Sequence, residues 1–187
     1  MTTAVWPDHL LTLDEWDELP KDDQHLFELA EGVLYVVPKP APLHQRAMWR
    51  LTWLLDEQLP RDLTALPDVE VVVDKPHPPT VRAPDVVVTR EEIAQLNPAR
   101  LDAVDVLVAV EIVSPGTGRI DRVTKLCEYA EAGIPHYWLI DLTEPVALTV
   151  HKLADGLYEE VAKATERIKL GEPAALEIDP AGLLARD

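Results

Sequence analysis

Two carboxylates interrupt stretches of the chain that are otherwise apolar. Asp85 directly precedes the apolar run 86–88, and Glu111 stands inside the β-branched run 104–113. A carboxylate in such surroundings is costly unless it pairs with a positive charge or binds a cation. Lys125 follows Glu111 by 14 residues, on the polar face of the next predicted helix. If the two strands are neighbours, both carboxylates and the ammonium group can converge at one end of a sheet.

This combination of groups is typical of metal-assisted hydrolysis of a phosphate ester. Hard carboxylate oxygens suit Mg²⁺, with Mn²⁺ as an alternative, and these ions complete their coordination with water and a substrate phosphate. The cation activates water and neutralises charge on the phosphate, while a lysine can orient that water or stabilise the transition state. Each residue alone also has a structural explanation: Asp85 as a turn former, Glu111 as a solvent-facing or paired acid, Lys125 as a solvated helix residue. The order of the three favours the chemical explanation.

Hydrophobic periodicity predicts the elements that would position these residues. Apolar residues recur at three- and four-residue spacing over 43–59 and over 119–132, which predicts two amphipathic helices, the second ended by Gly133. A capping box at 12–15 predicts a short helix, and the segment 24–30 predicts another helical turn or two. β-branched and apolar runs predict strands at 33–37, 69–73, 84–89, 104–113 and 136–140.

The order of these elements along the chain predicts the fold class. Asp155-Gly156 lies between two apolar segments and predicts a C-terminal β-hairpin. The order of helices and strands predicts an α/β fold with a mixed central sheet flanked by helices. A length of 187 residues favours one domain over 1–187.

Composition excludes several classes of protein. The 17 basic and 34 acidic residues give a net charge of −17, which disfavours nonspecific coating of nucleic acids. The single cysteine, Cys127, excludes an internal disulfide and a cysteine zinc cluster. The first residues do not have the pattern of a signal peptide, and no apolar run approaches the roughly 18 residues of a membrane span. We therefore expect a cytoplasmic protein without a membrane partner.

The order Pro84-Asp85, then Glu111-x-Val113, then a helix resembles the PD-(D/E)xK nuclease superfamily, which has the restriction-endonuclease-like fold. The chain is more similar still to a bacterial family of restriction-endonuclease-like proteins, formerly a domain of unknown function. This resemblance covers a core of about 12–153. Its sharpest motifs lie at 110–117, 121–134 and 137–141, with a further block within 27–45.

The resemblance implies roles for individual residues. The superfamily places its lysine two residues after the acid, where this chain has Val113; in the similar family the lysine has moved to the following helix, and Lys125 matches it. Asp85 and Glu111 are then the Mg²⁺ ligands and Lys125 the catalytic lysine. Glu28 matches an acid that the superfamily often supplies from its first helix.

Four further residues are candidates for binding substrate. His44 and Gln45 match a family block near the same cleft, and Arg119 and Arg122 make the segment before Lys125 locally positive. The expected function is a Mg²⁺-dependent endonuclease that hydrolyses DNA, working as a homodimer because two sites related by a two-fold axis can cut both strands. Two alternatives stay open: a catalytically silent nuclease fold that serves as a binding or regulatory subunit, and a metal-dependent phosphoesterase acting on small nucleotides.

Overall fold

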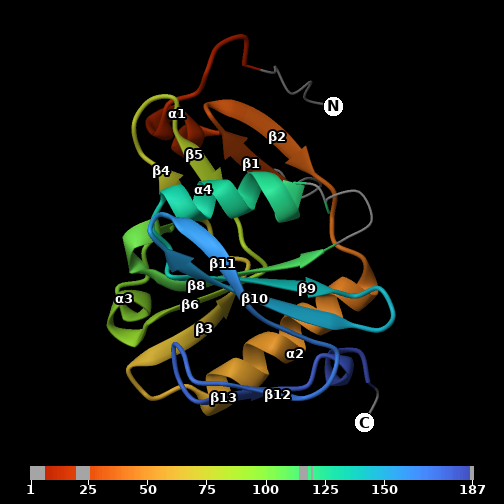
Figure 1. The fold of residues 1–187 in the computed structure, drawn as a ribbon. Helices are drawn as coiled ribbons and strands as arrows, with labels where there is room; N and C mark the ends of the chain where they lie inside the picture. Colours follow the sequence, from red (N-terminus) through yellow and green to blue (C-terminus); the bar gives the residue numbers. More distant parts are fainter. Residues whose placement is uncertain (1–6, 20–25, 114–117, 119, 186–187) are drawn as a thin grey trace.

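The computed structural model describes residues 7–19, 26–113, 118 and 120–185. Their strands form a five-stranded sheet, a six-stranded sheet and a small two-stranded sheet (Figure 1). The five-stranded sheet has the order β2-β1-β5-β4-β7. Its strands are β1 (Leu26–Ala30), β2 (Val33–Val37), β4 (Val71–Asp74), β5 (Thr80–Arg82) and β7 (Leu101–Asp102). The helix α1 (Leu13–Glu18) contributes to the core of this sheet and has the predicted capping box.

The prediction of a helix at 24–30 is wrong, because its described part, 26–30, is strand β1. β1 pairs along its whole length with β2 in a hairpin. The two turn residues, Glu31 and Gly32, have φ values of 48° and 74°, and two consecutive positive φ values are typical of the turn that suits the twist of a hairpin. Gly32 therefore closes a strand pair and does not end a helix. As a consequence, Glu28 is carried by a strand.

The six-stranded sheet has the order β11-β10-β9-β8-β6-β3 and holds most of the predicted strands. β8 and β9 run parallel, and the other neighbours are antiparallel. Its strands are β3 (Leu63–Pro67), β6 (Val86–Arg90), β8 (Val106–Val113), β9 (His136–Asp141), β10 (Ala147–Ala154) and β11 (Leu157–Ala164). The sequence pattern did not predict β3, whose five residues lack a clear alternation of polar and apolar side chains, or β5, which has three residues.

The pleat of the six-stranded sheet places the two candidate carboxylates on one face. Val86 of β6 pairs with Val110 of β8, and both belong to the core on the α2 side. Since successive side chains point to opposite faces, Asp85 and Glu111 lie on the other face. Continuing the antiparallel register by one residue puts them opposite each other.

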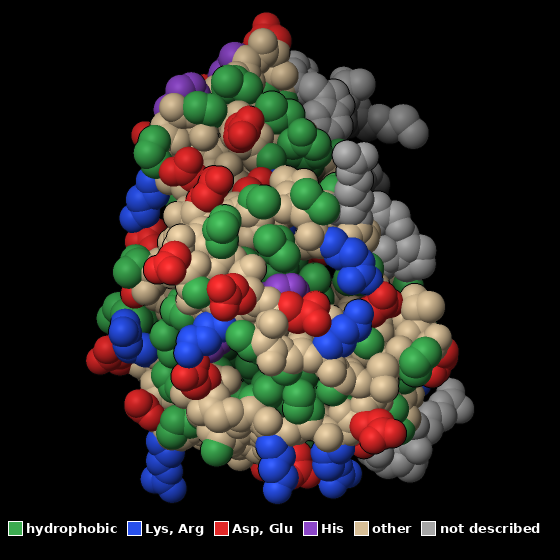
Figure 2. Space-filling view, in the orientation of Figure 1, with side chains coloured by type: hydrophobic (Ala, Val, Ile, Leu, Met, Phe, Trp, Pro, Cys, Tyr) green, Lys and Arg blue, Asp and Glu red, His purple; other side chains and the backbone are tan. Residues whose placement is uncertain are grey.

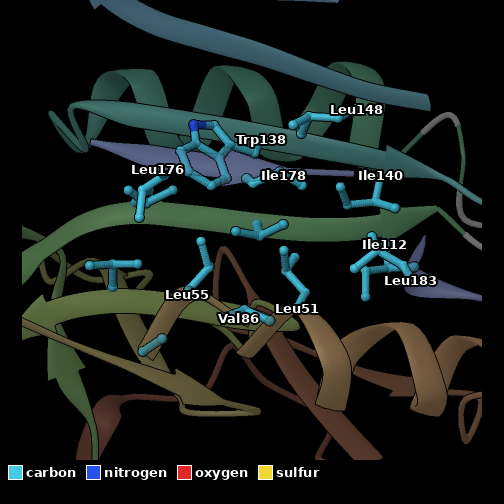
Figure 3. Packing of buried hydrophobic residues seen from close by; sticks show 14 of the residues in the cluster. Leu51, Leu55, Val86, Ile112, Trp138, Ile140, Leu148, Leu176, Ile178 and Leu183 are labelled. Carbon is cyan, nitrogen blue, oxygen red and sulfur yellow. The ribbon is translucent and has the colours of Figure 1, made fainter. Parts of the chain in front are cut away.

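The helix α2 (Pro42–Gln58) covers one face of the six-stranded sheet, as predicted. Leu51 and Leu55 point from the helix into a core that also contains the fully buried Trp138 (Figure 3). Trp49 and Trp53 lie one turn apart on the outer face of α2 and are 65% and 59% exposed. This packing holds α2 against the sheet. His44, in the first turn of α2, lies at the end of β8 and contacts the carbonyl oxygen of Ile112.

The predicted helix at 119–132 is built from two parts. Its described residues form a π-helical turn, η2 (Ile120–Lys125), followed by α4 (Leu126–Glu131), which crosses between the two large sheets in Figure 1. Gly133, at φ 80°, ends the helix as predicted. π-turns inside helices are frequent at functional sites, and this one ends at Lys125.

The remaining elements complete the two ends of the molecule. The short helix α3 (Glu91–Gln95) follows β6, and the turn η1 (Ala103–Asp105) precedes β8. The predicted C-terminal hairpin is confirmed as β10 and β11, with Asp155 and Gly156 at φ values of 49° and 81°. The small sheet of β12 (Ile168–Leu170) and β13 (Leu176–Ile178) and the turn η3 (Ala181–Leu183) pack against α2. No helix in the described ranges is long and apolar enough to span a membrane.

Candidate active site

A buried lysine joins acids from both large sheets. Nζ of Lys125 lies 3.0 Å from Oε1 of Glu28, on β1, and 3.0 Å from Oε1 of Glu111, on β8. All three side chains are buried. Burial lowers the pKa of Lys125, but attraction to Glu111 and Glu28 outweighs this effect and raises the pKa above its ordinary value. Lys125 is therefore an ammonium ion at neutral pH.

Glu111 is held by two donors on the same oxygen. The hydroxyl group of Tyr129, on α4, donates to Oε1 of Glu111 at 2.8 Å, beside the ammonium group of Lys125. Burial is the main cause that raises the pKa of Glu111; Lys125 lowers this pKa, the negative charge of Asp85 raises it, and the net value is about 8. Burial therefore disfavours the charged form of Glu111 more than the positive charge of Lys125 stabilises it.

Asp85 is held at the end of β6 by a backbone amide and a histidine. The N–H of Ile112 donates to Oδ2 of Asp85 at 2.6 Å. Nε2 of His44 lies 3.3 Å from the same oxygen and 3.0 Å from the carbonyl oxygen of Ile112. Because a carbonyl only accepts, Nε2 of His44 carries a proton. Asp85, Glu111 and the carbonyl group of Ile112 therefore lie together at one end of the sheet.

We expect His44 to titrate above its ordinary pKa of 6.5 in the metal-free protein. Burial lowers the pKa of His44, but the hydrogen bond and attraction from Asp85 outweigh it and raise the pKa. Its contribution to stability is then fully present below pH 6.5 and is lost as the pH rises through the folded-state value. NMR titration of the imidazole C–H signals in EDTA measures this shift.

The matched comparison for that titration is Asp85→Asn, which should lower the pKa of His44. His136 and His151 serve as internal controls, since burial lowers the pKa of both. Equal pKa values for His44 in the wild type and in Asp85→Asn would contradict the assigned contact.

Arg82, which the sequence did not indicate as a site residue, completes the site. Arg82, on β5, donates from its NH1 atom to Oε2 of Glu28 at 2.9 Å. Its Nε and NH2 atoms donate to the two oxygens of Glu128, on α4, at 2.8 and 2.6 Å. Glu28, Arg82, Glu128 and Lys125 thus form a charged network, in which Arg82 bridges Glu28 and Glu128, and Lys125 binds Glu28. The network has two acids and two bases, so it is balanced without Glu111.

A weak signal for two of the missed residues was present in the sequence. Glu128 and Tyr129 follow Lys125 by three and four residues, the spacing that puts helical side chains on one face. Arg82 carried no such signal, because its partners lie 46 and 54 residues away.

Of the three predicted substrate-binding residues that the structure describes, one reaches the carboxylates. His44 contacts Asp85, whereas Gln45, its neighbour on α2, is exposed. Arg122 forms an ion pair with Asp141 at the end of β9 and is partly exposed. Arg119 lies outside the described residues. The structure therefore places His44 at the carboxylates and Arg122 on the surface.

The donor set fits a hard divalent cation that keeps much of its water. Groups of three or more His, Cys, Asp and Glu side chains suited to a metal ion are absent from the described ranges. Asp85 and Glu111 supply two carboxylates, and Ile112 adds a carbonyl oxygen. Hydrogen bonds from described residues reach Oδ2 of Asp85 and Oε1 of Glu111. One or two carboxylates plus water and substrate oxygens is the usual coordination of Mg²⁺.

The two sheets, the flanking helices and the order of the strands define an α/β protein of the restriction-endonuclease-like class. The chain matches the model of the family Uma2, described as "Putative restriction endonuclease", over residues 13–181, and it belongs to that family. The predicted family resemblance is confirmed by this match.

A solved structure supports the same fold. The chain is similar to a protein from Anabaena variabilis ATCC 29413 described as a "putative nuclease belonging to DUF820", with a TM-score of 0.73 and 20% sequence identity. The alignment covers 94% of this chain and 99% of the other. The predicted fold class is confirmed. A search of curated proteins found no match.

Proposed function

We propose that this protein is a Mg²⁺-dependent endonuclease that hydrolyses phosphodiester bonds of DNA. The observation that carries the proposal is the meeting of Asp85, Glu111 and Lys125, from three different elements, at one end of the six-stranded sheet. Family membership supports nuclease chemistry. Glu28 and His44 are also part of this arrangement, because they hold Lys125 and Asp85.

Asp85 and Glu111, with the carbonyl oxygen of Ile112, would hold the cation. When bound, a divalent cation lowers the pKa of water and offsets negative charge on the phosphate. The surrounding groups keep both carboxylates in place: Tyr129 and Lys125 hold Glu111, while the N–H of Ile112 and His44 hold Asp85.

Lys125 acts through its charge in this proposal. Attraction to Glu111 and Glu28 raises its pKa, which favours the ammonium form, and the proposal therefore gives Lys125 the role of a fixed positive charge. Hydrolysis forms a bond between a water oxygen and phosphorus and breaks one phosphorus–oxygen ester bond. The attacking water gives up a proton to solvent, the leaving sugar oxygen takes up a proton from solvent, and negative charge increases on the phosphate oxygens in the transition state. A fixed ammonium group close to that charge stabilises the transition state.

The acidic surface makes substrate binding depend on the site itself. The face seen in Figure 2 intersperses acidic and basic side chains, and its described part has no continuous basic band. With a net charge of −17, the protein as a whole repels DNA at long range, so a bound cation would have to raise the local potential at the site. We therefore propose that DNA binding weakens as the salt concentration rises. We also propose that the protein cuts both strands as a homodimer, and analytical ultracentrifugation would measure the mass of this dimer.

Plasmid cleavage tests the proposed function. Purified wild-type protein is incubated with supercoiled DNA in Mg²⁺, in Mn²⁺ and in EDTA over a range of salt concentrations, and nicked and linear products are quantified. Cleavage that requires the cation supports the proposal. Intact DNA under all conditions would overturn it: turnover of small nucleotides would then favour the phosphoesterase alternative, and binding without turnover the silent binding subunit.

Mg²⁺ should stabilise the folded protein through Asp85. A ligand that binds only the folded state adds about 2.7 kcal/mol of stability at 100 times its Kd. We expect Mg²⁺ to raise the free energy of unfolding of the wild type and to have a much smaller effect on Asp85→Asn, as measured by urea titration with and without the ion. The exposed Asp74→Asn is the matched control. Equal Mg²⁺ responses in the wild type and Asp85→Asn would remove Asp85 from the ligand set.

A further inference from the structure

The charged network described above joins the five-stranded sheet to α4 through Arg82, and Lys125 extends the connection to Glu111 on the six-stranded sheet. We propose that Arg82 is a positioning residue: together with Glu128 it fixes the carboxylate of Glu28, and Glu28 in turn holds the ammonium group of Lys125 against Glu111. This inference rests on the proposed function and names a further residue on which that function depends.

The geometry of Glu28 carries the first step. One of its oxygens, Oε2, accepts from Arg82 at 2.9 Å, and the other, Oε1, accepts from Lys125 at 3.0 Å. The carboxylate is therefore held at both ends, which fixes its rotation about the side chain. Loss of either donor would free the other oxygen to move.

The fork of Arg82 carries the second step. Its side chain is 5% exposed, and its three nitrogens bind two acids at once. The pairing with Glu128 is bidentate, which adds geometric specificity to the charge. Since Glu128 lies on the helix that directly follows Lys125, the fork ties β5 to the same segment that carries the lysine.

Charge balance carries the third step. Arg82 pairs with Glu28 and Glu128, whereas Lys125 pairs with Glu28 and Glu111, so the charge of Lys125 is divided between two acids. Without Arg82, Lys125 would be the nearest cation for Glu28 as well as for Glu111. We expect Nζ of Lys125 to shift toward Glu28 in that case, away from the position beside Glu111.

The variant Arg82→Lys tests this role while keeping the positive charge. A lysine has one compact ammonium group and does not reproduce the planar fork, so it leaves Glu28 or Glu128 unheld. Arg100→Lys is the matched control, because Arg100 also pairs with two acids, Asp17 and Glu70, outside the site. Glu128→Gln changes the other half of the fork at a partly exposed position.

The first measurement is independent of activity. The side-chain ammonium group of Lys125 is observed by ¹H–¹⁵N NMR, assigned with Lys125→Arg, and its hydrogen exchange is measured. We expect hydrogen exchange of the Lys125 ammonium group to be at least about tenfold faster in Arg82→Lys, because a hydrogen bond that is no longer fixed opens more often. The exchange rate should be unchanged in Arg100→Lys. An unchanged Lys125 signal and exchange rate in Arg82→Lys would overturn the proposal.

The second measurement is the rate of DNA cleavage. We expect kcat to fall about tenfold or more in Arg82→Lys, because small misplacements of a catalytic group are costly, with KM for DNA nearly unchanged; Glu128→Gln should act in the same direction. A change in KM alone would contradict positioning. If the wild type cleaves no DNA, the proposed function fails, and the ammonium measurement still decides whether Arg82 positions Lys125.

Discussion

Glu111→Gln is expected to lower the rate of Mg²⁺-dependent DNA cleavage by about 10²–10³-fold, the effect typical of losing one electrostatic element of an active site. The amide oxygen of glutamine can still accept the hydrogen bonds that Tyr129 and Lys125 donate to Oε1. What the substitution removes is the negative charge that would hold the cation. Plasmid cleavage at saturating Mg²⁺ measures the effect, and wild-type activity in this variant would exclude Glu111 from the reaction.

The same variant should be at least as stable as the wild type in EDTA. The pKa of Glu111 is raised from 4.5 to about 8 in the folded protein, so between these values the folded state binds more protons than the unfolded state. The free energy of unfolding of the wild type therefore falls as the pH rises from about 4.5 to about 8. Glu111→Gln should lack this part of the slope, whereas the exposed Glu159→Gln should keep it. Equal slopes in the wild type and Glu111→Gln would contradict a raised pKa of Glu111 in the folded protein.

Arg82→Met should lower the free energy of unfolding by about 3–5 kcal/mol, the usual cost of removing one partner of a buried ion pair. The methionine fills part of the volume of the arginine but leaves Glu28 with one cationic partner and Glu128 without its bidentate donor. Urea unfolding of the metal-free protein, followed by tryptophan fluorescence, measures this loss.

Arg167→Met is the control for that experiment. Arg167 also pairs with two acids, Glu177 and Asp179, but its side chain is 66% exposed. Ion pairs at the surface contribute about 0–1 kcal/mol, so this variant should remain close to the wild type. Similar losses for the two arginines would mean that burial does not set the strength of the Arg82 network.

Local pattern was enough to predict the two strand carboxylates. Asp85 and Glu111 stand out because an acid in an apolar run is energetically unusual, whichever fold surrounds it. The helix after Glu111 and its glycine end were equally clear. The resemblance to the nuclease family then implied roles for Lys125 and Glu28, and the structure joins Lys125 to both Glu28 and Glu111.

Arg82 and the nature of the segment around Glu28 depend on tertiary contacts. The residues of β1 are apolar and few, and such a run suits a helical turn as well as a strand; pairing with β2 decides between them. Arg82 meets Glu28 and Glu128 only because the five-stranded sheet packs over α4. The hydrophobic periodicity of one segment does not predict how two sheets pack against each other.

The division of the site between the two sheets bears on how such a protein can evolve. The proposed metal ligands, Asp85 and Glu111, belong to one sheet, while Glu28 and Arg82, which we propose position the lysine, belong to the other. In the proposed function, neither sheet alone therefore carries a complete centre. We therefore expect relatives to vary freely at the rims of each sheet but to preserve the distance between them.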